Sequence, residues 1–487
     1  MTAHEYGRAD GTPPLGMPAA PGSAPGPRPE PGPAPWPYGD GEPYGDTYAG
    51  TAVWPYGDRG QSQDRGPGEV RIPAQKTVTA ETAGGASGGT TGEAEKPARP
   101  GRDRYLDLLR SVALVRVVAY HLFGWAWLTV LFPSMGVMFA LAGSLMARSL
   151  ERPALSVIRS RVRRLLPPLW VFGALVMGLL FLQGWNPAKG PDTGGGFWSM
   201  VSVFNYLVPV GAPPYPVSIG SGAGLLESTW AEQAAGPLWY LRAYLWFVVA
   251  SPLLLWAFRR APWPTLLFPL ALTAVVGTGL VTIPGETGDA VQDFAVYGSC
   301  WVLGFAHHNG MLKQIPRYAA VSGASALMAF GLWWASGHLG PGGWNLNDIP
   351  LAQATWSFGI VVILLQYSPS WQKLPGRLAR WDKLVTLSNN RAVTIYLWHN
   401  LLIMATVPII DQVYGLPFMR SGTASSWLST TYVLWQFVLI WPLIGLAVLA
   451  VGWIEDLAAK RKPRLWPNGP NGSSRGRAGT RADAHHG

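Results

Sequence analysis

Arg110 and His121 stand in the first apolar stretch of the chain, in the pattern Arg-x10-His. On an α-helix, the path from Arg110 to His121 makes about three turns plus roughly 20°. Both side chains therefore leave the same face of the helix, about 16 Å apart along its axis. Asp107 lies one turn before Arg110 and falls on that face as well. Ionisable residues inside a membrane span are costly, so by default they indicate a functional site.

His121 is the first candidate for a catalytic residue, because histidine titrates near neutral pH and is the commonest general base. The alternative is a structural histidine that is hydrogen-bonded to a neighbouring helix. Arg110 keeps its charge and therefore needs a carboxylate, a phosphate or water inside the protein. Asp107 could supply that carboxylate, and a purely structural ion pair is the alternative here.

A second basic cluster lies at 159–164, where the sequence reads RSRVRR. Cytoplasmic loops of membrane proteins collect Lys and Arg, so one interpretation is that this loop only determines topology. Four arginines in six positions also suit a phosphorylated ligand such as coenzyme A, because guanidinium groups bind phosphates in a bidentate way. The two interpretations are compatible.

The elements that position these residues are predicted to be membrane helices. Only 13% of the 487 residues are charged, against about 25% in a soluble domain. From Tyr105 onward there are ten apolar stretches near the length of about 20 residues that a bilayer requires. They lie near 105–131, 134–150, 165–184, 236–257, 263–283, 291–308, 319–337, 350–368, 388–409 and 429–454. The sequence therefore predicts an all-α bundle of about ten transmembrane helices.

The distribution of Lys and Arg predicts the topology. With the N-terminus inside, the five outer loops carry only Lys189 and Arg420, and the other basic residues gather in cytoplasmic loops and at the C-terminus. We therefore expect a multi-pass protein of the cytoplasmic membrane with both termini in the cytoplasm. The apolar segment 197–210 is short, and we expect it to be re-entrant or interfacial.

The remaining segments and classes of partner follow from composition. Residues 1–100, rich in Pro and Gly, are predicted to be a disordered cytoplasmic tail, with a partner-binding tail as the alternative. The membrane domain is expected over 101–458 and a disordered basic tail over 459–487. Cys300 is the sole cysteine, and no Cys/His spacing resembles a zinc site, so we expect no metal. Because the basic residues follow the loops, we expect the lipid bilayer and not nucleic acid as a partner.

Several short motifs resemble those of the membrane acyltransferase 3 family. RYLDLLRSVALVRVVAYH at 104–121 is similar to the family's opening "LDxLR…H", and GVMFALAGSLM at 136–146 resembles its "FFxxSGxxL". The stretch 161–167 resembles "RxxRxxP", GPLWYLRAYLW at 236–246 resembles "LWFLxxLL", 294–304 resembles "FxxG", and 395–399 resembles "YLxH". The motifs follow one another in order over 102–454, and the ordered set is more specific than any one motif.

The resemblance implies a membrane O-acyltransferase. It would move an acyl group, with acetyl as the first expectation, from cytoplasmic acyl-coenzyme A to a hydroxyl of a carbohydrate, cell-envelope glycan or glycosylated metabolite. Attack of a hydroxyl on a thioester needs a base and stabilisation of the developing oxyanion. We assign His121 as the base, with a transient acyl-histidine as an alternative. Arg110 and Asp107 complete the catalytic set, with Arg110 binding or polarising the donor, and the coenzyme A phosphates are assigned to Arg161, Arg163 and Arg164.

Five more residues are assigned to the acceptor side or to supporting roles: Trp239, Arg242, Asp293, Tyr396 and His399. For His399, and also for Arg391, structural hydrogen bonding is the first interpretation, and positioning of the acceptor is the alternative. The chain departs from the family in two places. Ala142-Gly143 replaces the usual Ser-Gly, so Ser144 receives no role, and Arg242 stands where many members have a glutamate, which leaves the class of acceptor open.

A secondary transporter or exporter of a small polar metabolite is the main alternative function, because intramembrane charges also suit a substrate path. Transporters often contain repeated halves with interrupted helices at matching positions, and we find no such repeat here. A non-catalytic membrane scaffold is a further alternative. The acyl group, the acceptor, the choice between covalent and direct transfer, and the oligomeric state are not readable from the sequence.

Overall fold

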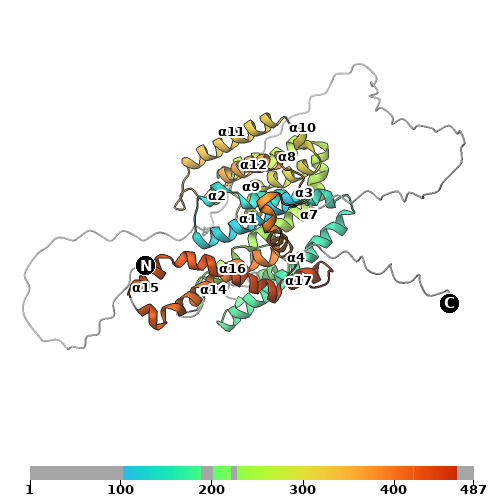
Figure 1. Cartoon of the computed structure of the whole chain (residues 1–487). Coiled ribbons are helices and arrows are strands. Elements are labelled where there is room, and N and C mark those ends of the chain that lie inside the picture. The colour runs from blue at the N-terminus through green and yellow to red at the C-terminus, as the bar shows by residue number, and fades with distance from the viewer. Residues whose placement is uncertain (1–102, 188–200, 221–226, 421, 469–487) are drawn as a thin grey trace, which may run out of the picture. The chain divides into compact units, whose positions relative to one another are not determined.

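The computed structural model describes residues 103–187, 201–220, 227–420 and 422–468, and in these ranges the regular elements are all helices (Figure 1). The expected all-α architecture is therefore confirmed. The predicted N-terminal tail, 1–100, lies outside the described residues, as do residues 469–487 of the predicted C-terminal tail. Residues 459–468 of that tail are described, and they contact the helical domain.

Each of the ten apolar stretches contains a principal helix. The ten are α1 (Arg104–Phe123), α3 (Ser134–Ser149), α4 (Ala154–Leu182), α7 (Leu238–Arg260), α8 (Pro262–Val276), α9 (Gly285–His308), α11 (Arg317–Ser336), α12 (Pro350–Gln366), α14 (Ala392–Tyr414) and α16 (Tyr432–Val451). Short helices lie between them: α2 (Leu128–Leu131), α6 (Trp230–Ala235), α10 (Met311–Gln314), α13 (Asp382–Asn390) and α15 (Gly422–Thr430). A further short helix, α17 (Trp453–Ala458), follows α16.

Six helical segments of the described chain are long and apolar enough to cross a membrane. They are Leu128–Ser149, Ala154–Leu182, Trp230–Arg260, Arg317–Ser336, Ala392–Tyr414 and Tyr432–Val451. Two more apolar helices, α8 and α12, are shorter than a full span. α1 is not among the six, because its charged residues lower its mean hydropathy. The protein is thus a helical membrane protein, and the count of about ten spans stays a prediction.

Two segments differ locally from the expectation. The stretch 105–131 is interrupted at Gly124, whose φ of 64° is left-handed, so α1 ends there and α2 follows. Residues 159–164, expected as a loop, lie within α4, because helix formation begins after Pro153 and arginine is a good helix former. The basic cluster is therefore held on a rigid helix.

The described part of the segment 197–210 contains the 3₁₀ turn η2 (Val203–Tyr206) and no long helix. The indole N–H groups of Trp170 and Trp246 donate hydrogen bonds to the carbonyls of Leu207 and Val210. These bonds connect the segment to α4 and α7. Residues 197–200 lie outside the described residues.

α1 carries the first candidate site residues and lies centrally. It contacts α3 on one side and α14 and α16 on the other, and α13 also contacts it (Figure 1). Phe139 of α3, Phe247 of α7 and Trp301 of α9 form part of the aromatic core beside it, with the Phe247 and Trp301 rings stacked at 5.0 Å. α1 is thereby packed between α3 and the later helices α13, α14 and α16.

α3 and α9 approach each other closely at glycines. A Cβ atom added at Gly143 would lie 2.2 Å from the Trp301 carbonyl oxygen, and one at Gly304 would lie 2.2 Å from the Ala140 carbonyl oxygen. Small residues that let helix backbones meet are typical of membrane helix interfaces. Gly143 is thus needed for the close packing of α3 on α9. It belongs to the segment 136–146 that resembles the family's "FFxxSGxxL" motif.

We expect Gly143→Ala to destabilise the protein by about 1–3 kcal/mol, because the backbone atoms that the new methyl group would meet have nowhere to move. Thermal unfolding of the detergent-purified protein measures this. Gly178→Ala in α4 is the matched control, since a Cβ there meets nothing within 4 Å. Equal unfolding temperatures of the two variants would contradict the close contact between α3 and α9.

Candidate active site

Two cavities open on different parts of α1. The first, here called the histidine cavity, has a volume of about 340 Å³, and its lining includes Arg116, Tyr120, His121, Trp239, Gln292, Asp293, Tyr297, Asn347, Gln353 and Tyr396. The second, the arginine cavity, has a volume of about 680 Å³, and its lining includes Asp107, Arg110, Arg148, Arg161, Arg164, Tyr240, Tyr244, Tyr396, Glu455 and Arg461. Tyr396 of α14 lines both cavities.

His121 lies in the last turn of α1, and its side chain is exposed toward the histidine cavity. The imidazole ring lies 5.3 Å from the ring of Tyr120 and 5.0 Å from the ring of His399, centroid to centroid. The candidate base therefore combines an accessible position with a second histidine directly behind it.

His399 is fully buried in α14. Its Nδ1 lies 2.6 Å from the carbonyl oxygen of Tyr396, and since a carbonyl only accepts, Nδ1 carries the proton and donates. In the neutral ring Nε2 is then a bare acceptor, and no described residue forms a hydrogen bond with it. His399 lines neither cavity, so the geometry places it behind His121.

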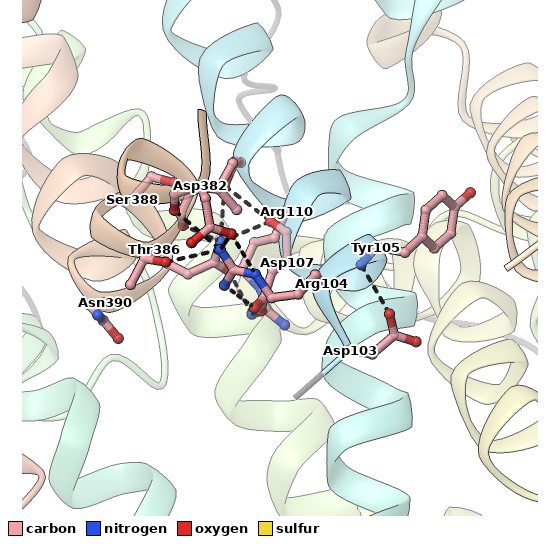
Figure 2. A network of polar contacts seen from close by, with 12 residues as sticks. Asp103, Arg104, Tyr105, Asp107, Arg110, Asp382, Thr386, Ser388 and Asn390 are labelled. Carbon is pink, nitrogen blue, oxygen red and sulfur yellow. Dashed lines mark hydrogen bonds and ion pairs between the residues drawn. The ribbon is translucent and has the colours of Figure 1, made fainter. Parts of the chain in front are cut away.

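Arg110 lies near the other end of α1 and lines the arginine cavity. Its Nη1 donates to Oδ1 of Asn389 at 2.9 Å and lies 3.9 Å from Oδ1 of Asp107. The same Asp107 pairs at 3.0 Å with Arg104, which also binds Asp382 (Figure 2). Asp107 is thus shared by two arginines, and its shorter contact is to Arg104.

Arg104 was not among the candidates from the sequence. Figure 2 shows its guanidinium between Asp107 and Asp382, and it also donates to Thr386 Oγ1 at 3.0 Å. Asp382 and Thr386 belong to α13, far along the chain. This network fixes the first turn of α1 against α13, and thereby holds Arg110 at the cavity wall.

The three arginines assigned to donor binding divide into two groups. Arg161 and Arg164 line the arginine cavity, and Arg161 donates to Ser149 Oγ at 2.9 Å. Arg163 points instead toward α17, where its Nε donates to the Ala458 carbonyl oxygen at 3.3 Å. Two basic residues that sequence analysis treated only as topology signals, Arg148 and Arg461, also line this cavity.

The acceptor-side candidates gather around the histidine cavity. Trp239 lines it and stacks on Tyr297, with ring centroids 5.6 Å apart and planes at 28°. Asp293 lines it as well and pairs at 3.3 Å with Arg242, which lies behind the cavity wall. Among the described residues, no three His, Cys, Asp or Glu side chains gather as metal ligands would.

Arg391 is fully buried, and its Nη2 pairs with Asp456 of α17 at 2.7 Å. This agrees with the structural role that the sequence favours for Arg391. The adjacent Glu455 faces the arginine cavity and accepts hydrogen bonds from the backbone N–H and hydroxyl of Thr394. Burial raises the pKa of Glu455 to about 7, against the opposing effects of the Thr394 bonds and the Arg391 charge.

We expect the pKa of Glu455 to make stability fall as pH rises. Between its ordinary value near 4.5 and about 7, the unfolded chain has lost this proton and the folded protein keeps it. Unfolding then releases a proton, so stability falls by up to about 1.4 kcal/mol per pH unit in this window. Glu455→Gln, which keeps the acceptor oxygen, should flatten the fall. Unfolding temperatures at pH 5, 6, 7 and 8 measure it, and identical slopes for both proteins would contradict the raised pKa.

A family model described as an acyltransferase domain matches residues 103–454. The chain belongs to the acyltransferase 3 family. Membership of the acyltransferase 3 family, together with the apolar helices, indicates a membrane acyltransferase. No curated protein and no solved structure matches the chain. The acyltransferase 3 match includes both ends of α1 and all of α14, and it ends just before Glu455.

Proposed function

We propose that the protein transfers an acyl group from cytoplasmic acyl-coenzyme A to a hydroxyl of a carbohydrate, cell-envelope glycan or glycosylated metabolite. The observation that carries the proposal is that the two cavities, one basic and one holding His121, share the wall residue Tyr396. Two substrates that enter from opposite ends of α1 would meet at this residue.

The arginine cavity suits the donor. Coenzyme A carries a 3′-phosphate and a diphosphate, and guanidinium groups bind such oxygens through paired N–H donors. Arg161 and Arg164 present two of these groups from one helix, and Arg110 extends the basic wall toward Tyr396. The distribution of Lys and Arg predicts that this end of the bundle faces the cytoplasm, where acyl-coenzyme A is found.

The histidine cavity suits a carbohydrate acceptor. Stacked Trp239 and Tyr297 offer an aromatic surface for the C–H face of a sugar ring. The amides of Gln292, Asn347 and Gln353 and the carboxylate of Asp293 offer donors and acceptors for hydroxyl groups. The buried Oε1 of Gln353 accepts no hydrogen bond from a described residue, so it is available to a ligand hydroxyl. A cavity with few charges and several amides favours a neutral polyhydroxyl compound.

The proposed reaction uses these positions. His121 removes the proton of the acceptor hydroxyl, and the hydroxyl oxygen attacks the thioester carbonyl carbon. The C–S bond then breaks, and the coenzyme A sulfur takes the proton as it leaves as a thiol. His399 positions the His121 ring and, with a bare Nε2 nearby, offers a second acceptor for the proton. In a two-step version, His121 first takes the acyl group from the thioester and releases the coenzyme A thiol. The acceptor hydroxyl then attacks this acyl-His121, the acyl C–N bond breaks, and the hydroxyl proton is passed to the released imidazole.

The experiment is acyl transfer by the purified full-length protein in detergent. Labelled acetyl-coenzyme A is supplied with extracted envelope glycans, and both labelled glycan and free coenzyme A thiol are measured. Matched appearance of the two products supports acyl transfer. If the protein neither binds nor consumes acetyl-coenzyme A or longer acyl-coenzyme A compounds, acyl transfer is excluded and transport becomes the function to test.

A further inference from the structure

The segment that follows the last long apolar helix forms part of the arginine cavity. Arg461 lines this cavity together with Arg161 and Arg164 of α4. The residue lies beyond the acyltransferase domain match, which ends at 454. From its position in the sequence, Arg461 is only one of several basic residues that follow the last long helix. In the structure it lines the arginine cavity.

The segment 459–468 is fastened to the bundle at several points. The buried guanidinium of Arg391 binds both Asp456 and the carbonyl oxygen of Arg464, and Asp456 also accepts from the backbone N–H of Arg464 at 3.1 Å. Asn390 donates to the Pro467 carbonyl oxygen at 2.9 Å. Residues on both sides of Arg461 are therefore held in place.

The turn just before Arg461 gives a second indication that its direction is fixed. Lys460 has a φ of 56°, the left-handed region that glycine normally occupies after a helix, and no other described non-glycine residue has a positive φ. The Lys460 N–H donates to Leu457 and the Arg461 N–H donates to Asp456, which closes the end of α17 in a Schellman motif. Such backbone persists where the surrounding structure fixes it.

The charges around the cavity point to an anionic ligand. Arg161, Arg164 and Arg461 come from two separate elements and carry like charges that repel one another. The nearby carboxylates have other partners, since Asp456 pairs with Arg391 and Glu455 accepts from Thr394. No described residue forms an ion pair with Arg461. A phosphate group bound among the three guanidiniums would remove this repulsion.

We propose that Arg461 is a donor-binding residue that holds a phosphate group of coenzyme A together with Arg161 and Arg164. This inference rests on the proposed function. It makes the C-terminal segment a wall of the donor site, so that removal of residues 459–468 would weaken donor binding even though no membrane helix is lost.

Binding of coenzyme A to the detergent-purified full-length protein, measured by titration calorimetry, tests the proposal. We expect Arg461→Ala to weaken coenzyme A binding about tenfold, the loss typical of one charge-assisted contact. Lys462→Ala removes the same charge at the next residue. Lys462 is exposed, as Arg461 is, but it does not line the cavity, so the change should alter binding less than about twofold. Acetyl-pantetheine, which lacks the nucleotide, should be turned over equally by wild type and Arg461→Ala.

Equal coenzyme A affinities for Arg461→Ala and Lys462→Ala would overturn the role of Arg461 and leave the proposed function intact. Equal loss of coenzyme A and acetyl-pantetheine use in Arg461→Ala would also overturn it, because the effect would then not depend on phosphate. If the wild type binds no coenzyme A, the proposed function itself fails. Arg461→Gln, which keeps a polar side chain, checks that the effect comes from lost charge, and it should match Arg461→Ala.

Discussion

His121→Ala is expected to reduce acyl transfer by about 10²–10⁴-fold, the contribution of a positioned general base. Coenzyme A affinity should stay unchanged, because Arg110 lies about 16 Å away along α1 and His121 does not line the arginine cavity. The variant should also fold, since the side chain lines an open cavity and fills no packed core. The rate of labelled acyl transfer and the affinity for coenzyme A are measured on the same preparation.

His338→Ala is the matched control for this variant. His338 is an exposed histidine after α11, stacked on Trp334 at 3.9 Å and outside both cavities. It should keep full activity. A His121→Ala protein that transfers acyl groups at the wild-type rate would remove His121 from the mechanism.

Arg391→Ala is expected to produce the largest loss of stability, about 3–5 kcal/mol, because it leaves the buried carboxylate of Asp456 without its cation. The Arg391 side chain is fully buried, and it also binds the Arg464 carbonyl oxygen, so the C-terminal segment should detach as well. Thermal unfolding in detergent measures the loss, and limited proteolysis near residue 464 measures the detachment.

Arg377→Ala is the control for stability. It removes an exposed arginine from the turn before α13 and should change the unfolding temperature little. Similar unfolding temperatures for Arg391→Ala and Arg377→Ala would contradict the buried ion pair.

The sequence predicted the helical elements well because the signal is local. A long apolar run indicates a helix, and each of the ten stretches contains one, although only six helical segments of the described chain are long and apolar enough to cross a membrane. The shared face of Arg110 and His121 also follows from local geometry, since both lie on the single helix α1. The structure places Arg110 and His121 at two different cavities. This could not be predicted from their spacing, because each cavity is completed by helices that are distant in the sequence.

The parts of the candidate site that sequence analysis missed all depend on contacts between distant residues. Arg104 meets Asp382 across 278 positions, so no local pattern indicates that Asp107 has a second arginine. Tyr396 was expected only as an acceptor-side or supporting residue. Its position between the two cavities depends on how α14 packs against the other helices, which the sequence does not show. Arg461 was counted with the basic end of the chain because the turn at Lys460, without a glycine, has no sequence signal.

Sidedness of transfer in sealed proteoliposomes tests the central claim most directly, that donor and acceptor approach one reaction centre from opposite ends of α1. Acyl-coenzyme A is sealed inside vesicles whose protein is oriented with the C-terminus inward, and the glycan acceptor is added outside. We predict acylated glycan outside and free coenzyme A retained inside. Acylation only when donor and acceptor share one compartment would contradict the account.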